Sequence, residues 1–169
     1  YLSPSLPDAG SLTDIRLQVP LRIYSADEKL LGEFGEQRRT PISFNEIPTD
    51  LVNAFIAAED NRFYSHPGVS AKGLSRAIGQ MITGSDVQTG GSTITMQVAK
   101  NYFLTPERNI IRKVREIFLA LQIEQRLSKQ QIIELYVNKI FLGHRSYGIV
   151  AAAQTYYGKS VQELTLEQF

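Results

Sequence analysis

One stretch of the sequence places acidic residues and a histidine where an apolar helical pattern ends. Within AAEDNRFYSHPG, residues 57–68, Glu59 follows Phe55 by four positions and so extends an apolar helical row. A carboxylate beside apolar surface holds a proton more readily than one in water, which suits a general base. The alternative is that Glu59 ends the helix and reaches water. His66 is expected to form hydrogen bonds within a loop rather than act as a base.

A second stretch, GGSTITMQVAK at residues 90–100, combines glycines with a helix start. Ser92 is a candidate N-cap, and free N–H groups at a helix N-terminus are a place where phosphate can bind. Thr93, Gln97 and Lys100 follow at spacings of four and three residues, hence on one helix face. A hydroxyl, an amide and an ammonium group suit a sugar that carries a phosphate. An ordinary polar helix face is the alternative, which spacing alone favours.

A short basic cluster follows, made of Arg108, Arg112, Lys113 and Arg115, with Glu116 behind it. Arg112 and Glu116 lie four residues apart, almost opposite an apolar stripe. That spacing is typical of a solvated helix face with a modest ion pair. A nucleic-acid site is disfavoured because the cluster is short and 18 basic against 17 acidic residues leave a net charge of +1.

A near match to the phosphate loop of ATPases occurs at residues 153–160, AQTYYGKS. Ala153 replaces the first glycine that the loop requires, and Tyr156 and Tyr157 would crowd the phosphates. The preceding alanines are typical of a helix rather than a strand. We therefore reject this motif.

Composition limits the class of protein. The 169 residues, 43% hydrophobic and 21% charged, predict one globular domain rather than a disordered or fibrous chain. The absence of cysteine excludes disulfides, thiol catalysis and thiolate metal sites, and two distant histidines disfavour a histidine-rich metal site. No apolar run reaches the roughly 18 residues that a membrane span needs. Because the sequence opens without methionine and stops within an apolar pattern, we expect a fragment of a longer protein.

The elements that must position these residues change character along the chain. Residues 1–13 read as a linker, and strict alternation over 15–24 predicts a strand that turns into a second strand over 30–34. After Pro48 the period becomes helical. Helices are predicted over 49–60, from Ser70 as N-cap to Ile82 and, after a glycine loop at 84–91, from Ser92 as N-cap. An apolar stripe predicts the next helix and is made of Ile110, Val114, Ile117, Phe118 and Leu121. Two further helices are predicted to begin at the capping box of Ser128 with Gln131 and at Ser160 with Glu163. The prediction is a mostly α domain over 45–169 behind a β segment within 1–44.

Taken together, these segments resemble the family 51 glycosyltransferases, the peptidoglycan polymerase module of class A bifunctional penicillin-binding proteins. The resemblance covers residues 15–169, and five motifs occur in the family's order. They are AAEDNRFYSHPGV, GGSTITMQVAKN, RKVRE, SKQQIIELYVNKIFLG and YGIVAAAQTYYGKS. The stretch PLRIYSADEKLLGEFGEQRR is similar to the part that follows the family's membrane anchor. One motif alone is weak evidence, but five in order are strong.

The resemblance implies a lysozyme-like, bilobed α fold, incomplete at its C-terminus, with a smaller lobe near the membrane. It implies that Glu59 is the catalytic base and Glu116 a second essential carboxylate. Tyr136 and Asn138 fall on the fourth motif and are expected to support the fold, and Met96 replaces the commoner glutamine. The residues expected to bind substrate or support its site are Asp60, Phe63, His66, Ser92, Thr93, Gln97, Lys100, Arg112 and Lys113.

The implied activity is polymerisation of lipid II onto the growing glycan chain by an inverting single displacement that releases undecaprenyl pyrophosphate. The resemblance implies a location on the outer, periplasmic face of the bacterial cytoplasmic membrane, through an N-terminal anchor that this sequence lacks. The parent protein would also carry a transpeptidase domain and meet other cell-wall synthesis proteins, and moenomycin would inhibit it. No cofactor or metal is required, although a divalent cation such as Mg²⁺ would suit the pyrophosphate.

Two other functions stay open from the sequence. A lytic muramidase shares the lysozyme-like fold and a catalytic glutamate, but cleaving a glycan involves no pyrophosphate and needs no cationic motif. A non-catalytic glycan-binding module is disfavoured by the presence of both Glu59 and Glu116. An apolar patch beside the cleft is also expected to touch the membrane. Its expected members are Ile78, Met81, Ile82, Tyr102, Phe103 and Leu104.

Overall fold

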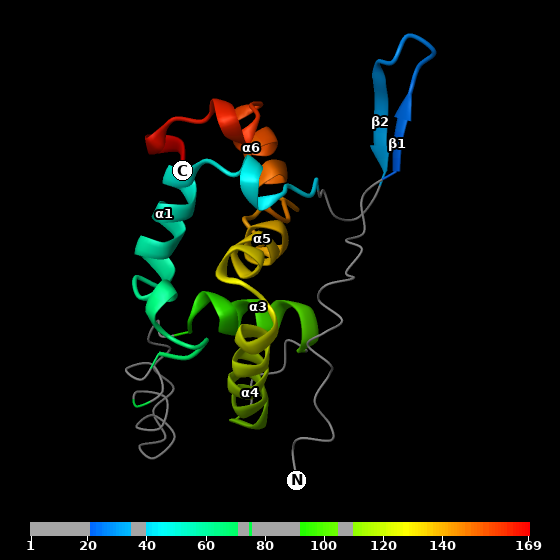
Figure 1. The fold of residues 1–169 in the computed structure, drawn as a ribbon. Helices are drawn as coiled ribbons and strands as arrows, with labels where there is room; N and C mark the ends of the chain where they lie inside the picture. Colours follow the sequence, from blue (N-terminus) through cyan, green and yellow to red (C-terminus); the bar gives the residue numbers. More distant parts are fainter. Residues whose placement is uncertain (1–20, 35–39, 71–74, 76–91, 105–109) are drawn as a thin grey trace.

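The computed structural model describes residues 21–34, 40–70, 75, 92–104 and 110–169, and the chain is mostly helical behind a short β segment (Figure 1). The predicted strand over residues 15–20, most of the helix capped by Ser70, the glycine loop at 84–91 and Arg108 lie outside these residues. So do Ile78, Met81 and Ile82 of the expected membrane patch. No helix in the described part of the chain is both long and apolar enough to span a bilayer.

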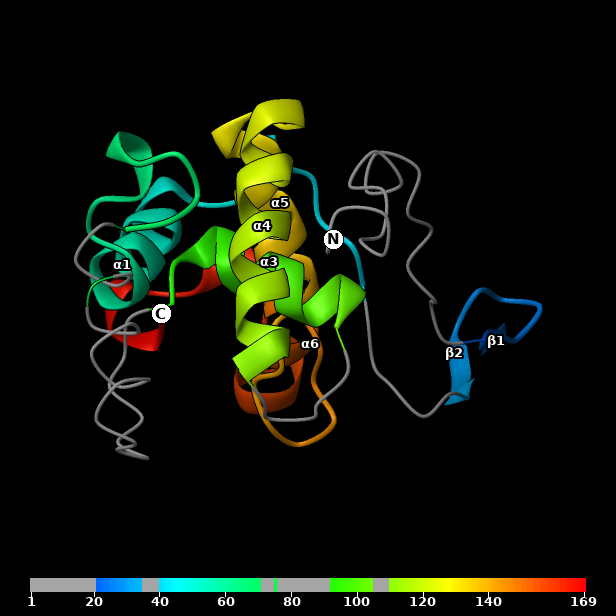
Figure 2. The same ribbon diagram turned by 90° about the horizontal axis from the view of Figure 1, so that it is seen from below.

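The β segment is an antiparallel hairpin of β1 (Leu21–Tyr24) and β2 (Leu30–Phe34), which pairs Leu21 with Phe34. Its turn closes with a hydrogen bond of 2.8 Å from the Ser25 N–H to the Lys29 carbonyl. The hairpin stands to one side of the helices in both views (Figures 1 and 2). The two strands are therefore held by each other. The buried face that such alternation predicts is not found at Ile23, which is 43% exposed.

Helices α3 (Ile94–Phe103), α4 (Ile110–Arg126) and α5 (Lys129–Lys139) pack against one another and form the centre of the molecule (Figure 2). Apolar side chains from all three are fully buried there, and burial of such side chains is the main stabilising contribution. These side chains are Ile94, Val98, Leu119, Ile123, Ile132, Ile133 and Val137. Tyr102, Phe103 and Leu104 are half-buried and pack against this core, so core packing explains their apolar character.

Helix α1 (Thr49–Glu59) joins the core through Leu51 and Val52. The chain before it forms a short turn, η3 (Phe44–Glu46), and is tied to α5 by side chains. Asn138 accepts from the Ile42 N–H at 2.9 Å and donates to the Ile42 carbonyl at 2.8 Å. The side chain of Asn138 thereby satisfies both backbone groups of a buried residue, as a paired strand would.

Local start signals were predicted correctly at two places. Ser128 and Gln131 form a capping box at α5, and Ser160 and Glu163 form one at the short turn η5 (Val161–Glu163). Helix α6 (Ile149–Tyr157) ends at Gly158 in the left-handed conformation. The rejected phosphate-loop motif is therefore a helix and its C-cap. The chain finishes in η6 (Leu166–Gln168).

The orientation of α4 differs from the prediction. The expected inward stripe included Phe118, which is 47% exposed, whereas Leu119, Ala120 and Ile123 are fully buried. Glu116 is only 1% exposed. The helix is rotated so that this carboxylate faces inward, because cations on its own helix compensate the charge there, as described below.

Candidate active site

Glu59 is the last residue of α1, and its side chain is exposed. The interpretation in which the chain turns here and the carboxylate reaches water therefore holds, and the expectation of apolar surroundings was wrong. Gln97 Nε2, from α3, donates a hydrogen bond of 2.7 Å to Glu59 Oε2. This bond fixes one carboxylate oxygen and leaves the other accessible to an incoming hydroxyl group.

The next residue, Asp60, is buried and organises the loop that follows α1. It accepts from His66 Nε2 through both carboxylate oxygens, at 3.0 and 2.8 Å, and from the Ile94 N–H at 3.2 Å. Because the Gly68 N–H donates to His66 Nδ1 at 3.1 Å, this pattern assigns the ring proton to Nε2. Both ring nitrogens are thus engaged within the protein, and Asp60 joins the end of α1 to the start of α3 through the Ile94 N–H.

Phe63 lies beneath this loop, in the short turn η4 (Phe63–Ser65), and is fully buried. Lys129 Nζ sits 4.4 Å from the centroid of its ring and donates to the His66 carbonyl at 2.9 Å. Glu124 accepts from the same ammonium group at 2.7 Å. Phe63 therefore supports the site from the core and has no surface to offer a substrate.

The N-terminus of α3 is capped by Thr93, whose Oγ1 accepts from the Met96 N–H at 3.1 Å. The prediction of Ser92 as the N-cap was wrong by one residue. Thr93 is buried and also donates to the Gly68 carbonyl, so its hydroxyl group is fully used inside the protein. Ser92 is instead the acceptor of a hydrogen bond of 2.8 Å from Lys113 Nζ.

Glu116 forms a compact ion-pair group with two cations of α4. Lys113 Nζ lies 2.6 Å from Glu116 Oε1, and Arg112 Nη1 lies 3.5 Å from Glu116 Oε2. The expectation of a solvated face with a modest ion pair was wrong, because Glu116 is almost fully buried while the cations are partly exposed. Two cations against one carboxylate leave a local excess of one positive charge at the surface.

Lys100 lies one turn beyond Gln97 on α3. Its side chain is exposed and, within the described part of the chain, has neither a hydrogen-bond nor an ion-pair partner. Its ammonium group is available to a ligand. Gln97 and Lys100 are thus the two members of the predicted polar face that keep contact with the surface, since Thr93 is buried.

The first turns of α3 connect the two halves of this arrangement. On one side Gln97 holds Glu59, and on the other Ser92 holds Lys113. A carboxylate with an accessible oxygen and a region of excess positive charge therefore lie on either side of one helix end. Such a pair can accept a proton from a nucleophile and stabilise an anionic leaving group. Among the described residues, no group of carboxylates and histidines could hold a metal ion.

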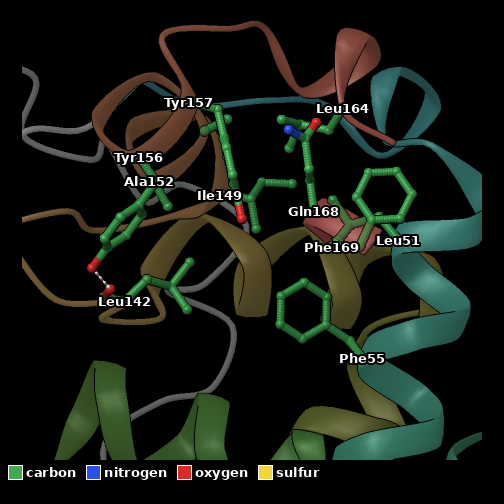
Figure 3. A pocket seen from close by; sticks show the side chains of 11 residues that line it. Leu51, Phe55, Leu142, Ile149, Ala152, Tyr156, Tyr157, Leu164, Gln168 and Phe169 are labelled. Atoms are coloured by element: carbon green, nitrogen blue, oxygen red, sulfur yellow. Dashed lines mark hydrogen bonds between the residues drawn. The ribbon is translucent and has the colours of Figure 1, made fainter. Parts of the chain in front are cut away.

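A separate apolar cavity of about 220 Å³ lies between α1, α6 and the last residues of the chain (Figure 3). Phe55, Ile149, Tyr157 and Phe169 contribute to its walls. Its lining contains no carboxylate and no cation. It therefore offers no general base or anion-binding group, and we place the chemistry at α3.

Sequence reasoning missed the roles of two residues that shape the site, Glu124 and Gly68. Glu124 accepts from Thr95 Oγ1 at 2.6 Å and from Lys129, and so pins the His66 loop to α4 and α5. A Cβ atom on Gly68 would lie 2.7 Å from the Ala120 carbonyl oxygen, so only glycine allows this approach. These contacts join distant segments, and no local pattern signals them.

Comparison with known proteins places the chain in a family. The family model described as transglycosylase matches residues 27–169. Penicillin-binding protein 1A of Pseudomonas aeruginosa is 59% identical over 99% of this chain, and that of Escherichia coli is 52% identical over 99%. The chain spans about a fifth of the length of these relatives, 20% in both cases.

A crystal structure of penicillin-binding protein 1A from Haemophilus influenzae is 36% identical, with a TM-score of 0.42, and covers 91% of this chain and 13% of that one. The family model alone covers well over half of the sequence, including all the motifs that carry the candidate site. The chain belongs to the transglycosylase family.

Proposed function

We propose that this chain is a peptidoglycan glycosyltransferase domain that polymerises lipid II into glycan strands. The observation that carries the proposal is the placement of Glu59 and the Lys113–Glu116–Arg112 group on either side of the N-terminus of α3. The first supplies a base and the second an excess of positive charge. Membership of the transglycosylase family and similarity to penicillin-binding proteins 1A support the same reaction.

In this reaction Glu59 takes the proton from the 4-hydroxyl group of the acceptor sugar of lipid II. The acceptor oxygen forms a bond to the anomeric carbon of the growing chain's terminal sugar. The bond from that carbon to undecaprenyl pyrophosphate breaks, and the pyrophosphate leaves with the electron pair. One displacement inverts the anomeric configuration from α to β. Lys113, Arg112 and Lys100 stabilise the charge on the leaving group.

The proposed setting is the outer face of the bacterial cytoplasmic membrane, where the lipid tails of both substrates stay in the bilayer. The growing glycan chain, other cell-wall synthesis proteins and, in a longer parent protein, a transpeptidase domain are the proposed partners. We expect the reaction to need no cofactor. Activity measured with and without EDTA tests whether a divalent cation such as Mg²⁺ assists the pyrophosphate.

The test is incubation of the full-length protein with labelled lipid II, followed by separation of polymer from substrate. We expect polymer from the wild type and a loss of about 10²–10⁴-fold in Glu59→Gln, which keeps the size of the side chain but cannot accept the proton. Asp50→Asn removes a carboxylate from the exposed face of the same helix and serves as the matched control, with activity unchanged.

The same experiment separates the rival functions. If Glu59→Gln polymerises at the wild-type rate, the assignment of the base is wrong. If the wild type shortens preformed glycan and makes no polymer, the protein is a muramidase. If it binds glycan but does neither, it is a binding module.

A further inference from the structure

Tyr136 has a buried hydroxyl group that nothing satisfies. Its side chain is fully buried in the C-terminal half of α5, and its ring packs edge-on against Phe55, with centroids 5.5 Å apart and planes at 84°. The hydroxyl oxygen has no hydrogen-bond partner in the described part of the chain. Buried tyrosine hydroxyls normally have a partner, and one without a partner costs stability. Phenylalanine would fill the same space without that cost.

Phe55, against which Tyr136 packs, belongs to the same helix as the candidate base. Phe55 lies one helical turn before Glu59 on α1, so both side chains are on the same face of that helix. Burial raises the pKa of Tyr136, and the negative charge of Glu59 raises it further. The phenol therefore keeps its proton over the working range of pH, and toward a carboxylate it is a donor.

Most of the other ionisable groups on the elements around α5 are engaged elsewhere or point to solvent. Arg115 on α4 is half-buried, and its buried Nε has no hydrogen-bond partner in the described part of the chain. Among the described residues, Glu59 is the one charged group whose field shifts the pKa of Tyr136. The engaged groups are Asp60 with His66, Glu116 with Lys113 and Arg112, Glu124 with Lys129, Glu134 with the Phe44 N–H, Glu46 with the Ser43 N–H, and Lys139 over the ring of Tyr102, while Lys100 is exposed.

We propose that Tyr136 is a positioning residue for Glu59, whose carboxylate receives a hydrogen bond from the Tyr136 hydroxyl group when substrate is bound. The inference rests on the proposed function, in which Glu59 is the base. Gln97 already holds Oε2, and a second donor at the other oxygen prevents rotation of the carboxylate. A carboxylate has lone pairs left for the acceptor hydroxyl group. Hydrogen bonds of this kind often form fully only in the substrate complex.

The test is Tyr136→Phe in the full-length protein, with kcat and KM for lipid II measured across pH and the thermal midpoint of unfolding measured beside them. Loss of a hydrogen bond to the ionised carboxylate disfavours the ionised base. We expect kcat to fall about tenfold at the acid end with KM little changed. The acid limb of the pH profile should move to higher pH. The thermal midpoint should stay equal or rise, since an unsatisfied group is removed.

Tyr156→Phe is the matched control, because it removes a hydroxyl group that donates to the Leu142 carbonyl at 2.7 Å and takes no part in the candidate site. Its kcat and pH profile should match the wild type. In a Glu59→Gln background, Tyr136→Phe should cause no further loss of the residual activity. A further loss there, an unchanged acid limb, or a fall in kcat equal at every pH with a lower thermal midpoint would each overturn the proposal.

A second measurement distinguishes failure of the proposed function from failure of the role of Tyr136. If the wild type makes no polymer, the carboxyl carbon signals of ¹³C-labelled glutamate still report on Glu59, assigned by its loss in Glu59→Gln. With the donor-substrate mimic moenomycin present, Tyr136→Phe should then move the titration of this signal to higher pH. An unmoved titration refutes the role of Tyr136 whatever reaction the protein catalyses.

Discussion

Lys113 and Glu116 lie on the same face of α4, and Lys113 Nζ donates to Glu116 Oε1 over 2.6 Å. The carboxylate is almost fully buried, whereas the ammonium group keeps part of its surface and also donates to Ser92. Glu116 therefore fixes the position of the Lys113 ammonium group and orients it toward the start of α3. A ligand phosphate would meet an ammonium group that is already positioned, which reduces the cost of ordering it on binding.

Glu116→Gln should both destabilise the protein and weaken the binding of a lipid-linked pyrophosphate. The change leaves Lys113 and Arg112 facing each other without the buried countercharge, and we expect a loss of about 1–3 kcal/mol in the free energy of unfolding. Chemical denaturation and moenomycin titration measure the two effects. Asp50→Asn, on the exposed face of α1, is the control. Wild-type stability in Glu116→Gln would show that the ion pair contributes nothing.

Lys100→Ala should weaken the binding of moenomycin by about 1.5–3 kcal/mol, the contribution of a hydrogen bond to a charged group. Its ammonium group is exposed and has no partner in the described chain, so the substitution should leave stability unchanged. Arg112→Ala should weaken binding by a similar amount. Lys29→Ala, in the hairpin turn with a side chain 81% exposed, is the control for removing one positive charge. Equal affinity in wild type and both site variants removes the pyrophosphate assignment.

Gly68→Ala should destabilise the fold by about 2–4 kcal/mol, because overpacking adds to backbone strain. Gly68 has φ +91°, and an added Cβ atom would lie 2.7 Å from both the Ala120 carbonyl oxygen and Glu124 Cγ. Gly158→Ala is the control, since it has φ +63° with nothing within 4 Å and should cost only about 1 kcal/mol. Thermal unfolding of the two variants gives the comparison. Equal losses would mean that the contact with α4 does not restrict this position.

Tyr136 should not ionise with the exposed tyrosines in a spectrophotometric titration. Its pKa is raised in the folded state, so the unfolded state releases this proton first as pH rises. The contribution of Tyr136 to the free energy of unfolding is therefore complete below the unfolded-state pKa of about 10, and it falls as pH rises above that value. Of the 8 tyrosines, this one should ionise only as the protein unfolds. Tyr136→Phe should remove that step, and a titration unchanged by the substitution would contradict the prediction.

The helices were predictable where their signals are local. Thr49–Glu59 and the capping boxes at Ser128 and Ser160 follow from neighbouring residues, and the structure has them. The rotation of α4 was not predictable, because apolar periodicity treats Glu116 as an outward residue. Its burial depends on Lys113 and Arg112, which neutralise the carboxylate inside the fold.

The sequence motifs named residues for the candidate site but did not give their geometry. The motifs named Glu59, Gln97 and Lys113, but not that Gln97 holds Glu59 across 38 residues of sequence. Whether a polar residue such as Thr93 faces a ligand or the interior is decided by the segment packed against it. Here that segment is the loop at Gly68, whose carbonyl group accepts a hydrogen bond from the Thr93 hydroxyl group.

The two hydrogen bonds between the Asn138 side chain and the Ile42 backbone also have a mechanical consequence. A pull on the chain from before Thr40 reaches Ile42, whose two hydrogen bonds to Asn138 lead into the C-terminal half of α5. The Phe44 N–H passes load to Glu134 on the same helix, through a bond of 2.8 Å. Tension therefore enters the central helix before it reaches α1. A force applied through the segment before Thr40 therefore acts on α5 first, and the end of α1 that carries Glu59 does not bear it directly.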